Sequence, residues 1–153
     1  MTHEYVIALN GLVATSAPGP EPAVAVGWAA EAVLAVGSNE TVGAISRGDS
    51  TFLDVLGCVI TPLPDDPARA DQVIRESTDP GADIAKLLAE AGLLAPDSTL
   101  EAGSVADLAF WGPRSDRADP HGRGGFHLVA TVRDGAFTEG DEHYGPFPAA
   151  ARS

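Results

Sequence analysis

Residues 126–138 read FHLVATVRDGAFT, and this stretch decides how the rest of the chain is interpreted. Its first part is rich in the β-branched and aromatic residues that favour strands. Asp134 and Gly135 then form a dipeptide that is typical of tight hairpin turns, because both positions tolerate a positive φ. The stretch therefore predicts a β-hairpin, and residues 106–111 (ADLAFW) predict the strand before it.

The N-terminal part of the chain has the same short-strand character. Its apolar runs are short and are separated by turn residues, which favours strands over helices. The predicted elements are two strands around the Asn10-Gly11 turn within 5–13, a hairpin of 23–28 and 32–36 that ends in turn residues 37–40, and two strands within 52–61 that are broken at Gly57.

One helix is predicted, over residues 81–91. Asp79 is suited to its N-cap and Gly92 to its C-cap. The apolar face of this helix consists of Ile84, Leu87 and Leu88. Residues 64–80 are polar, are interrupted by prolines and lack a clear period, so we expect them to form a linker.

These elements predict a mainly β fold, a small sandwich or barrel-like composite domain with one helix. The chain has 17 glycines and 12 prolines among 153 residues, which favours many short strands over a helical bundle. Each half supplies too few strands to bury both faces of a sheet, so we expect both halves to meet in one domain over 1–153. The expected parts are N-terminal strands in 4–63, the linker 64–80, the helix 81–92 and C-terminal strands in 99–140.

The charge balance excludes several classes of partner. Nine Lys and Arg stand against 22 Asp and Glu, for a formal net charge of −13. This balance repels phosphate backbones and anionic lipid, so we expect no nucleic-acid and no membrane binding. The N-terminus lacks a basic signal region and no apolar run is long enough to span a bilayer. A single cysteine, Cys58, fits a reducing compartment, and we expect a cytoplasmic protein.

Two separated motifs occur in a characteristic order. The first, in FLDVLGCVITP (52–62), is carried by Asp54, Gly57 and Pro62. The second, in LEAGSVADL (100–108), is carried by Leu100, Glu101, Gly103, Ala106, Asp107 and Leu108. Together they resemble the entry and return strands of the small β-sandwich in the amidohydrolase superfamily, the urease, hydantoinase and imidazolonepropionase relatives. In that family the chain crosses between the two motifs through a metal-binding (β/α)8 barrel, and Gly135 resembles the turn of the family's last hairpin.

The sequence departs from this family where the metal would bind. The family places His-x-His just after the entry proline, where this chain has Asp65, Asp66 and Pro67. Only residues 64–81 separate the two halves, so the barrel is missing from the resemblance. The histidines are also not at ligand-like spacing, and we expect no metal, no cofactor and no catalytic residue. They are His3, His121, His127 and His143.

The loop over 112–125 carries the densest group of chemically capable side chains, Arg114, Arg117, His121 and Arg123. Arginine binds carboxylates and phosphates through paired donors, and the glycines of this loop let backbone amides approach an anion. These four residues form our candidate ligand-binding site. The alternative is a surface loop in which Arg and Asp side chains pair loosely.

Five aspartates have a structural and a functional interpretation. Asp65, Asp66 and Asp71 either bind a hard cation or belong to a solvated linker. Asp54 and Asp107 stand at strand ends, where we expect them to hydrogen-bond the backbone and to have no part in catalysis.

Two further residues have reactive side chains. Cys58 lies in an apolar strand, where we expect a buried thiol and no nucleophile. His127 lies in the strand FHLV, where alternation places it opposite its apolar neighbours and therefore toward solvent.

The resemblance leads to three functional hypotheses. The first is a non-catalytic scaffold, interaction or small-ligand-binding domain. The second is a hydrolase-related subunit for C–N bond hydrolysis that needs a separate barrel partner, and the third is a small enzyme that uses the 112–125 loop. Removal of a barrel should uncover apolar surface. We therefore expect a homodimer with helix 81–91 at its interface, or a protein partner on the surface that a barrel would cover.

Overall fold

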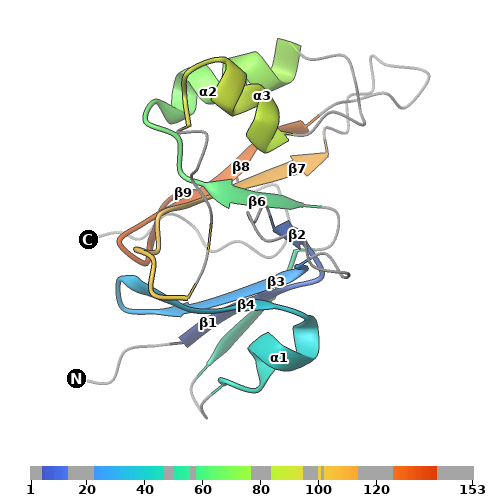
Figure 1. The fold of residues 1–153 in the computed structure, drawn as a ribbon, viewed down its shortest axis with the longest axis vertical. Helices are drawn as coiled ribbons and strands as arrows, with labels where there is room; N and C mark the ends of the chain where they lie inside the picture. The colour runs from blue at the N-terminus through green and yellow to red at the C-terminus, as the bar shows by residue number, and fades with distance from the viewer. Residues whose placement is uncertain are drawn as a thin grey trace.

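The computed structural model describes residues 5–13, 23–46, 50–55, 58–76, 84–94, 100, 102–113 and 126–140. Within these residues the apolar runs form short strands and the polar segments between them form three short helices (Figure 1). The strands are β1 Tyr5–Leu9, β2 Leu12–Val13, β3 Ala25–Ala29, β4 Ala32–Gly37, β5 Thr51–Asp54, β6 Val59–Pro62, β7 Leu108–Pro113, β8 Phe126–Arg133 and β9 Ala136–Gly140. The helices are α1 Asn39–Gly43, α2 Pro67–Glu76 and α3 Ile84–Glu90.

The strands form two sheets. The first has the order β4-β3-β1-β5 and the second the order β2-β6-β7-β8-β9. The pairs β1–β5 and β2–β6 are parallel, and the other pairs are antiparallel. Because β2 and β6 come from the N-terminal half and β7 to β9 from the C-terminal half, both halves meet in one β-structure. The predicted mainly β composite fold is confirmed.

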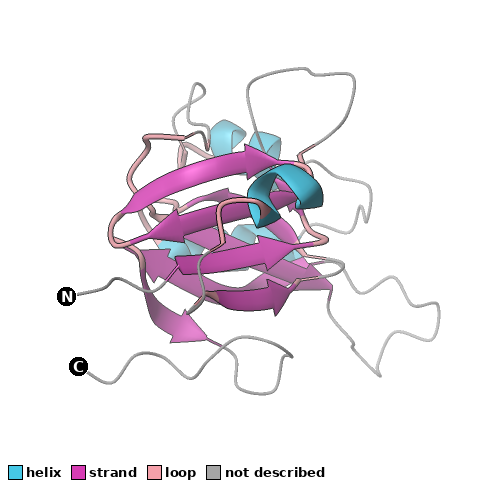
Figure 2. Cartoon of the chain, turned by 90° about the horizontal axis from the view of Figure 1, so that it is seen from below, coloured by secondary structure: helices cyan, strands magenta, loops and turns pink. Residues whose placement is uncertain are grey.

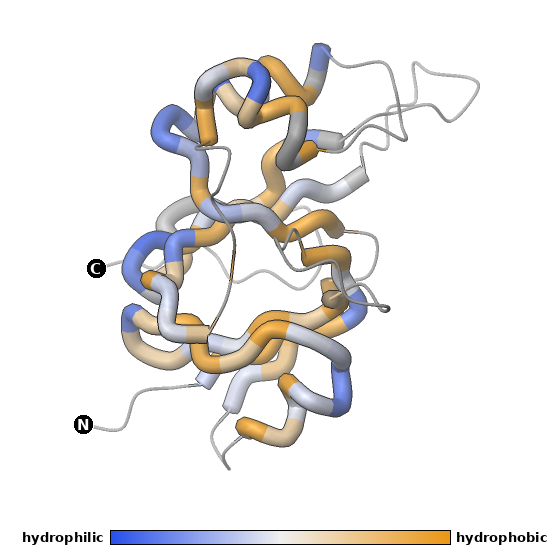
Figure 3. Tube along the Cα trace, in the orientation of Figure 1, coloured by the Kyte–Doolittle hydropathy of each residue, from blue (hydrophilic) through white to orange (hydrophobic). Residues whose placement is uncertain are grey.

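Four layers result from this arrangement: α1, the first sheet, the second sheet, and α2 with α3 (Figure 1). Seen from below, α1 lies in front of the strands, and the other helices lie behind them (Figure 2). The strands consist largely of hydrophobic residues, whereas the turns at the ends of the hairpins are hydrophilic (Figure 3). β3 and β7 are thus buried on both faces, which explains their apolar runs without alternation.

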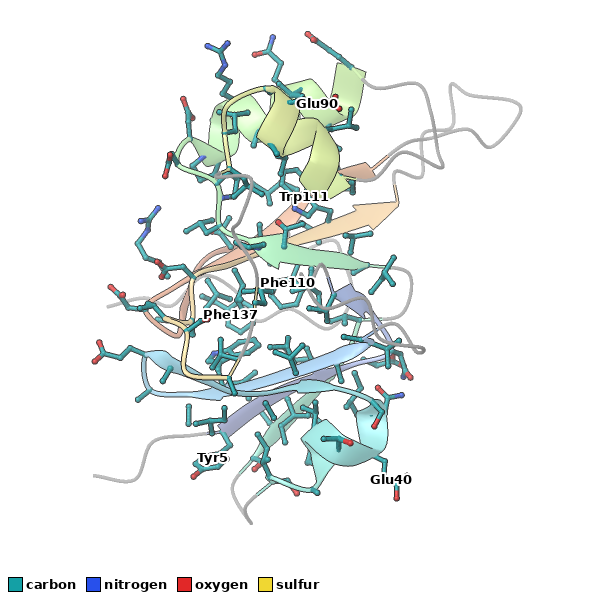
Figure 4. The ribbon with its side chains drawn as sticks, in the orientation of Figure 1. Tyr5, Glu40, Glu90, Phe110, Trp111 and Phe137 are labelled. Carbon is teal, nitrogen blue, oxygen red and sulfur yellow. The ribbon has the colours of Figure 1, made fainter. Side chains whose placement is uncertain are left out.

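Three aromatic rings fill the space between the sheets. Trp28 of the first sheet lies 6.2 Å from Phe110 and 5.9 Å from Phe137, both of the second sheet, measured between ring centroids. Phe110 and Phe137 point toward the first sheet, and Trp111, the next residue along β7, points toward α2 and α3 (Figure 4). Trp111 packs there with Ile74 of α2 and Leu88 of α3, and all three are buried.

The turns of two hairpins meet at one end of the sandwich. Gly135, in the β8–β9 turn, has φ +83 and donates its N–H to Ala106 O at 2.9 Å. Its carbonyl accepts a hydrogen bond of 3.0 Å from Trp28 Nε1. A Cβ at this position would overlap the carbonyl of Ala30 in the β3–β4 turn. Gly135 is therefore required by both its φ and its neighbours.

Aspartate completes this contact. The Asp134 N–H donates to Asp107 Oδ1 at 2.8 Å, which fixes the β8–β9 turn against the residue before β7. We call the six residues of this region the turn junction: Trp28, Ala30, Ala106, Asp107, Asp134 and Gly135. The predicted backbone role of Asp107 is confirmed.

Several predicted elements are confirmed. The hairpins β3–β4 and β8–β9 form as expected, and two strands lie within 52–61. The C-cap of α3 is Gly92, with φ +76, whose N–H donates to Ala89 O at 3.1 Å. Leu93 N–H donates to Leu88 O at 2.9 Å, which completes the pair of bonds typical of a glycine-terminated helix. The expected N-cap, Asp79, lies outside the described residues.

The expectation of a linker over 64–80 was wrong for Pro67–Glu76, which form α2. Asp66 Oδ1 accepts a hydrogen bond of 3.1 Å from Arg69 N, so Asp66 caps the helix and Pro67 takes its first position. The buried residues Ala70 and Ile74 are four apart and define a narrow face. Such a face is too narrow to give a clear period in the sequence.

Two smaller expectations also need correction. Residues 37–40, predicted as a turn, begin α1, whose N-cap Ser38 accepts from Thr41 N at 3.1 Å. The strands on either side of Asn10-Gly11 form, but they do not pair with each other. β1 belongs to the first sheet and β2 to the second, so this turn carries the chain from one sheet to the other.

We predict that Gly135→Ala lowers the free energy of unfolding by ~3 kcal/mol or more, because it adds left-handed strain and an overlap with the Ala30 carbonyl. The matched control is Gly92→Ala, with a similar φ of +76 and open space around the Cβ position, for which ~1 kcal/mol is expected. Urea unfolding followed by tryptophan fluorescence measures both. Equal losses in the two variants would show that the turn junction does not hold the sheets together.

Candidate functional site

The four residues of the predicted ligand-binding loop lie outside the described residues, and the structure describes only the base of their loop. They are Arg114, Arg117, His121 and Arg123. β7 ends at Pro113, which is paired with Phe126 at the start of β8, and Gly112 is paired with His127. The two ends of the loop are therefore held side by side by an antiparallel ladder. We call these paired residues and Leu128 the loop base.

Helix α2 holds one side of the loop base. Asp71 Oδ1 accepts a hydrogen bond of 2.8 Å from the backbone N–H of Leu128. The β8–β9 ladder ends at the pair of Ala130 with Gly140, so the amide of Leu128 lies beyond the reach of β9. The carboxylate of Asp71 therefore accepts the hydrogen bond that a neighbouring strand would otherwise accept. A hydrogen bond to a charged carboxylate is stronger than one to a neutral carbonyl.

His127 also belongs to the loop base. Its side chain is only partly exposed, and its Nδ1 atom is buried. The expectation that alternation turns His127 toward solvent was therefore wrong in part. Leu128, the next residue, packs with the cluster under α2 and α3, so alternation places His127 on the opposite face, the one that carries Val129 of the core between the sheets.

A buried polar pair fixes the strand that leads into the loop. Trp111 Nε1 donates to Thr61 Oγ1 at 3.0 Å, and this hydroxyl donates to Pro62 O at 2.9 Å. Thr61 and Trp111 are both fully buried, so each polar group needs the other. The sequence offered no signal for this pair, because its residues are 50 positions apart.

The aspartates near α2 have structural partners. Asp66 caps the helix, Asp71 binds the Leu128 amide, and the backbone N–H of Asp65 donates to Leu93 O at 3.2 Å. Among the residues that the structure describes, no group of three or more His, Cys, Asp or Glu is placed to hold a metal ion. Asp66 thus caps α2, and Asp71 joins α2 to β8, so both belong to a helical segment and not to a linker.

Cys58 lies in the core between the sheets with 1% of its surface exposed. The expected buried thiol is confirmed. Asp107 accepts from a backbone amide, whereas Asp54 accepts from a side chain. Its Oδ1 is bound by Asn10 Nδ2 at 3.1 Å. In the part of the chain described above, no helix is long and apolar enough to cross a membrane.

Asn10, Asn39 and Asp54 form a polar cluster that sequence reasoning missed. Asn10 and Asp54 end the parallel strands β1 and β5, and Asn39 begins α1. Asn39 Nδ2 donates to Asn10 Oδ1 at 2.7 Å, and Asn10 N donates to Asn39 Oδ1 at 3.0 Å. Because carboxyl ends of parallel strands meet at one edge, the register of β1 with β5 brings Asn10 and Asp54 together, and the packing of α1 on the first sheet adds Asn39.

The chain was compared with protein-family models, with curated proteins and with solved structures, and none of the three comparisons gave a match.

Proposed function

We propose that this chain is a non-catalytic scaffold or interaction domain with the architecture of an amidohydrolase composite sandwich. The observation that carries the proposal is the helical pair α2 and α3. It lies in the chain between β6 and β7, where the family inserts its barrel, and it covers the outer face of the second sheet. A sheet whose outer face is covered by its own chain needs no barrel to bury its apolar residues.

The contacts of the return motif also support a scaffold. Gly103 N–H donates to Val33 O at 2.9 Å, and Ala106 N–H donates to Glu31 O at 2.8 Å. Asp107 accepts from the Asp134 amide. Gly103 and Ala106 thus join the segment before β7 to the first sheet, and Asp107 fixes the β8–β9 turn. These roles need no substrate.

We predict that metal removal leaves the free energy of unfolding unchanged and that zinc-, nickel- or iron-loaded protein does not hydrolyse cyclic amides or ureides. The reason is that the His-x-His position is occupied by Asp65, Asp66 and Pro67. Urea unfolding with and without a chelator, together with a hydrolysis assay, tests this. Metal-dependent hydrolysis that is lost in His121→Ala or His127→Ala would contradict it and favour a small enzyme. Hydrolysis that appears only with a separate barrel protein would favour a hydrolase subunit.

A second candidate function is the binding of a small anion by the 112–125 loop. It is favoured by the loop base, where Asp71 and the β7–β8 ladder hold both ends of a connection that contains three arginines. Arginine groups on a fixed base lose less freedom when they bind a carboxylate or phosphate.

We predict that Arg114→Ala, Arg117→Ala and Arg123→Ala each weaken the binding of inorganic phosphate about tenfold, the loss expected for one charge-assisted hydrogen bond. Arg69→Ala and Arg133→Ala are the matched controls, because both are exposed arginines outside the loop. Titration calorimetry measures the affinities. Equal losses in the control variants would indicate general charge attraction, and unchanged affinity in all five would contradict a binding loop.

We also propose that the chain forms a homodimer and is cytoplasmic. Leu88 is fully buried within its own chain, whereas Leu87 is only partly buried. Among the apolar side chains of α3 that the structure describes, Leu87 therefore leaves more surface for a second copy than Ile84 and Leu88 do.

We predict that Leu87→Asp converts a dimer to a folded monomer in light scattering, because the charge would be buried at the interface. Leu88→Asp is the contrasting variant and should unfold the chain, since its partners are Trp111 and Ile74 of the same chain. A wild-type chain that stays monomeric at high concentration would contradict the dimer.

A further inference from the structure

Two independent features of the turn between β1 and β2 favour the dipeptide Asn-Gly. Asn10 has φ +67, a conformation that asparagine tolerates better than most residues with a side chain. At Gly11 an added Cβ would lie 3.0 Å from Val55 Cγ2 and 3.1 Å from Ile60 Cδ1, so a larger residue does not fit without movement. The passage from the first sheet to the second thus favours asparagine at position 10 and glycine at position 11.

The same dipeptide, Asn-Gly, is prone to deamidation of the asparagine side chain. In an open chain the backbone nitrogen of the glycine loses its proton to water and attacks Cγ of the asparagine. The N–Cγ bond forms, the Cγ–Nδ2 bond breaks, and ammonia leaves with a proton taken from water. Water then opens the cyclic imide to aspartate or isoaspartate. Glycine permits this attack because it has no side chain to hinder the approach.

Native contacts hold each of the reacting groups. Gly11 N–H donates to Val24 O, in the residue before β3, at 2.8 Å, and this contact holds the attacking nitrogen in its protonated form and away from the Asn10 side chain. Asn10 Nδ2, the leaving group, donates to Asp54 Oδ1 at 3.1 Å. Asn10 Oδ1 accepts from Asn39 Nδ2 at 2.7 Å, so the side-chain amide is fixed at both ends. The attack requires these contacts to open.

We propose that Asn10 is a deamidation site gated by the fold, and that its modification is a one-way step. Deamidation replaces the donor Nδ2 by a carboxylate oxygen, which then faces the carboxylate of Asp54. An attractive contact of 3.1 Å becomes a repulsion between two like charges. A molecule that opens at this cluster, reacts and closes again therefore regains the contact between the ends of β1 and β5 only in weakened form.

Peptide mass mapping of the full chain tests whether the native contacts of Asn10 and Gly11 slow the deamidation of Asn10. Asn10 and Asn39 are the two asparagines of the sequence, and Asn39 is followed by Glu40, so Asn39 is a slow internal control. In urea we expect Asn10 to deamidate much faster than Asn39. In the native protein we expect the Asn10 rate to fall by about tenfold or more, because reaction then needs a local opening. A native rate equal to the rate in urea overturns the proposal.

Variants test the one-way step. Asn10→Asp, which produces the reacted side chain, should lower the urea midpoint, although aspartate also tolerates a positive φ. The double variant Asn10→Asp with Asp54→Asn exchanges donor and acceptor and should recover at least half of that loss. Asp54→Asn alone is the matched control. An unchanged midpoint in Asn10→Asp, or no recovery in the double variant, overturns the claim of repulsion at this contact.

Discussion

The turn junction is the contact on which the two sheets depend. Gly135 donates its amide to Ala106, accepts from the Trp28 indole and leaves room for the Ala30 carbonyl. Trp28 in turn packs against Phe110 and Phe137, so one hydrogen bond orients the largest side chain of the core. Sheet-on-sheet packing has few directional contacts of its own. A hydrogen bond at the end of the sandwich therefore sets how the two sheets are placed on each other.

Much of this architecture was predictable because it depends on local signals. The hairpin turns at Asp134-Gly135, the apolar runs of β3 and β7 and the glycine after α3 are each visible within a few residues of sequence. The sequence did not predict helix α2, because Ala70 and Ile74 are the two residues of its narrow apolar face that are fully buried. So narrow a face gives no clear helical period. The stability of α2 comes from Asp66 at its N-terminus and from packing on β8, and the second of these is a tertiary effect.

In the candidate site, too, the features within one segment were predictable and the contacts between distant segments were not. Composition alone identifies the 112–125 loop as rich in arginine, but nothing in the sequence indicates that Asp71 accepts from the Leu128 amide, 57 residues away. The Thr61–Trp111 pair and the Asn10–Asn39–Asp54 cluster are likewise products of register between distant strands. Hydrophobic pattern predicts which elements exist. Polar contacts between elements become visible only when the register is known.

The β1–β2 turn and the β8–β9 turn use the same local solution. At one, Asn10 has φ +67 and is followed by Gly11, whose amide is bound by Val24 O at 2.8 Å. At the other, Asp134 has φ +52 and is followed by Gly135, whose amide is bound by Ala106 O at 2.9 Å. A sharp change of direction demands a left-handed residue, and close packing demands a glycine after it. Because Asn-Gly and Asp-Gly are also the dipeptides most open to attack by the following nitrogen, the hydrogen bond to that nitrogen serves two purposes. It fixes the turn, and it keeps the backbone chemically intact.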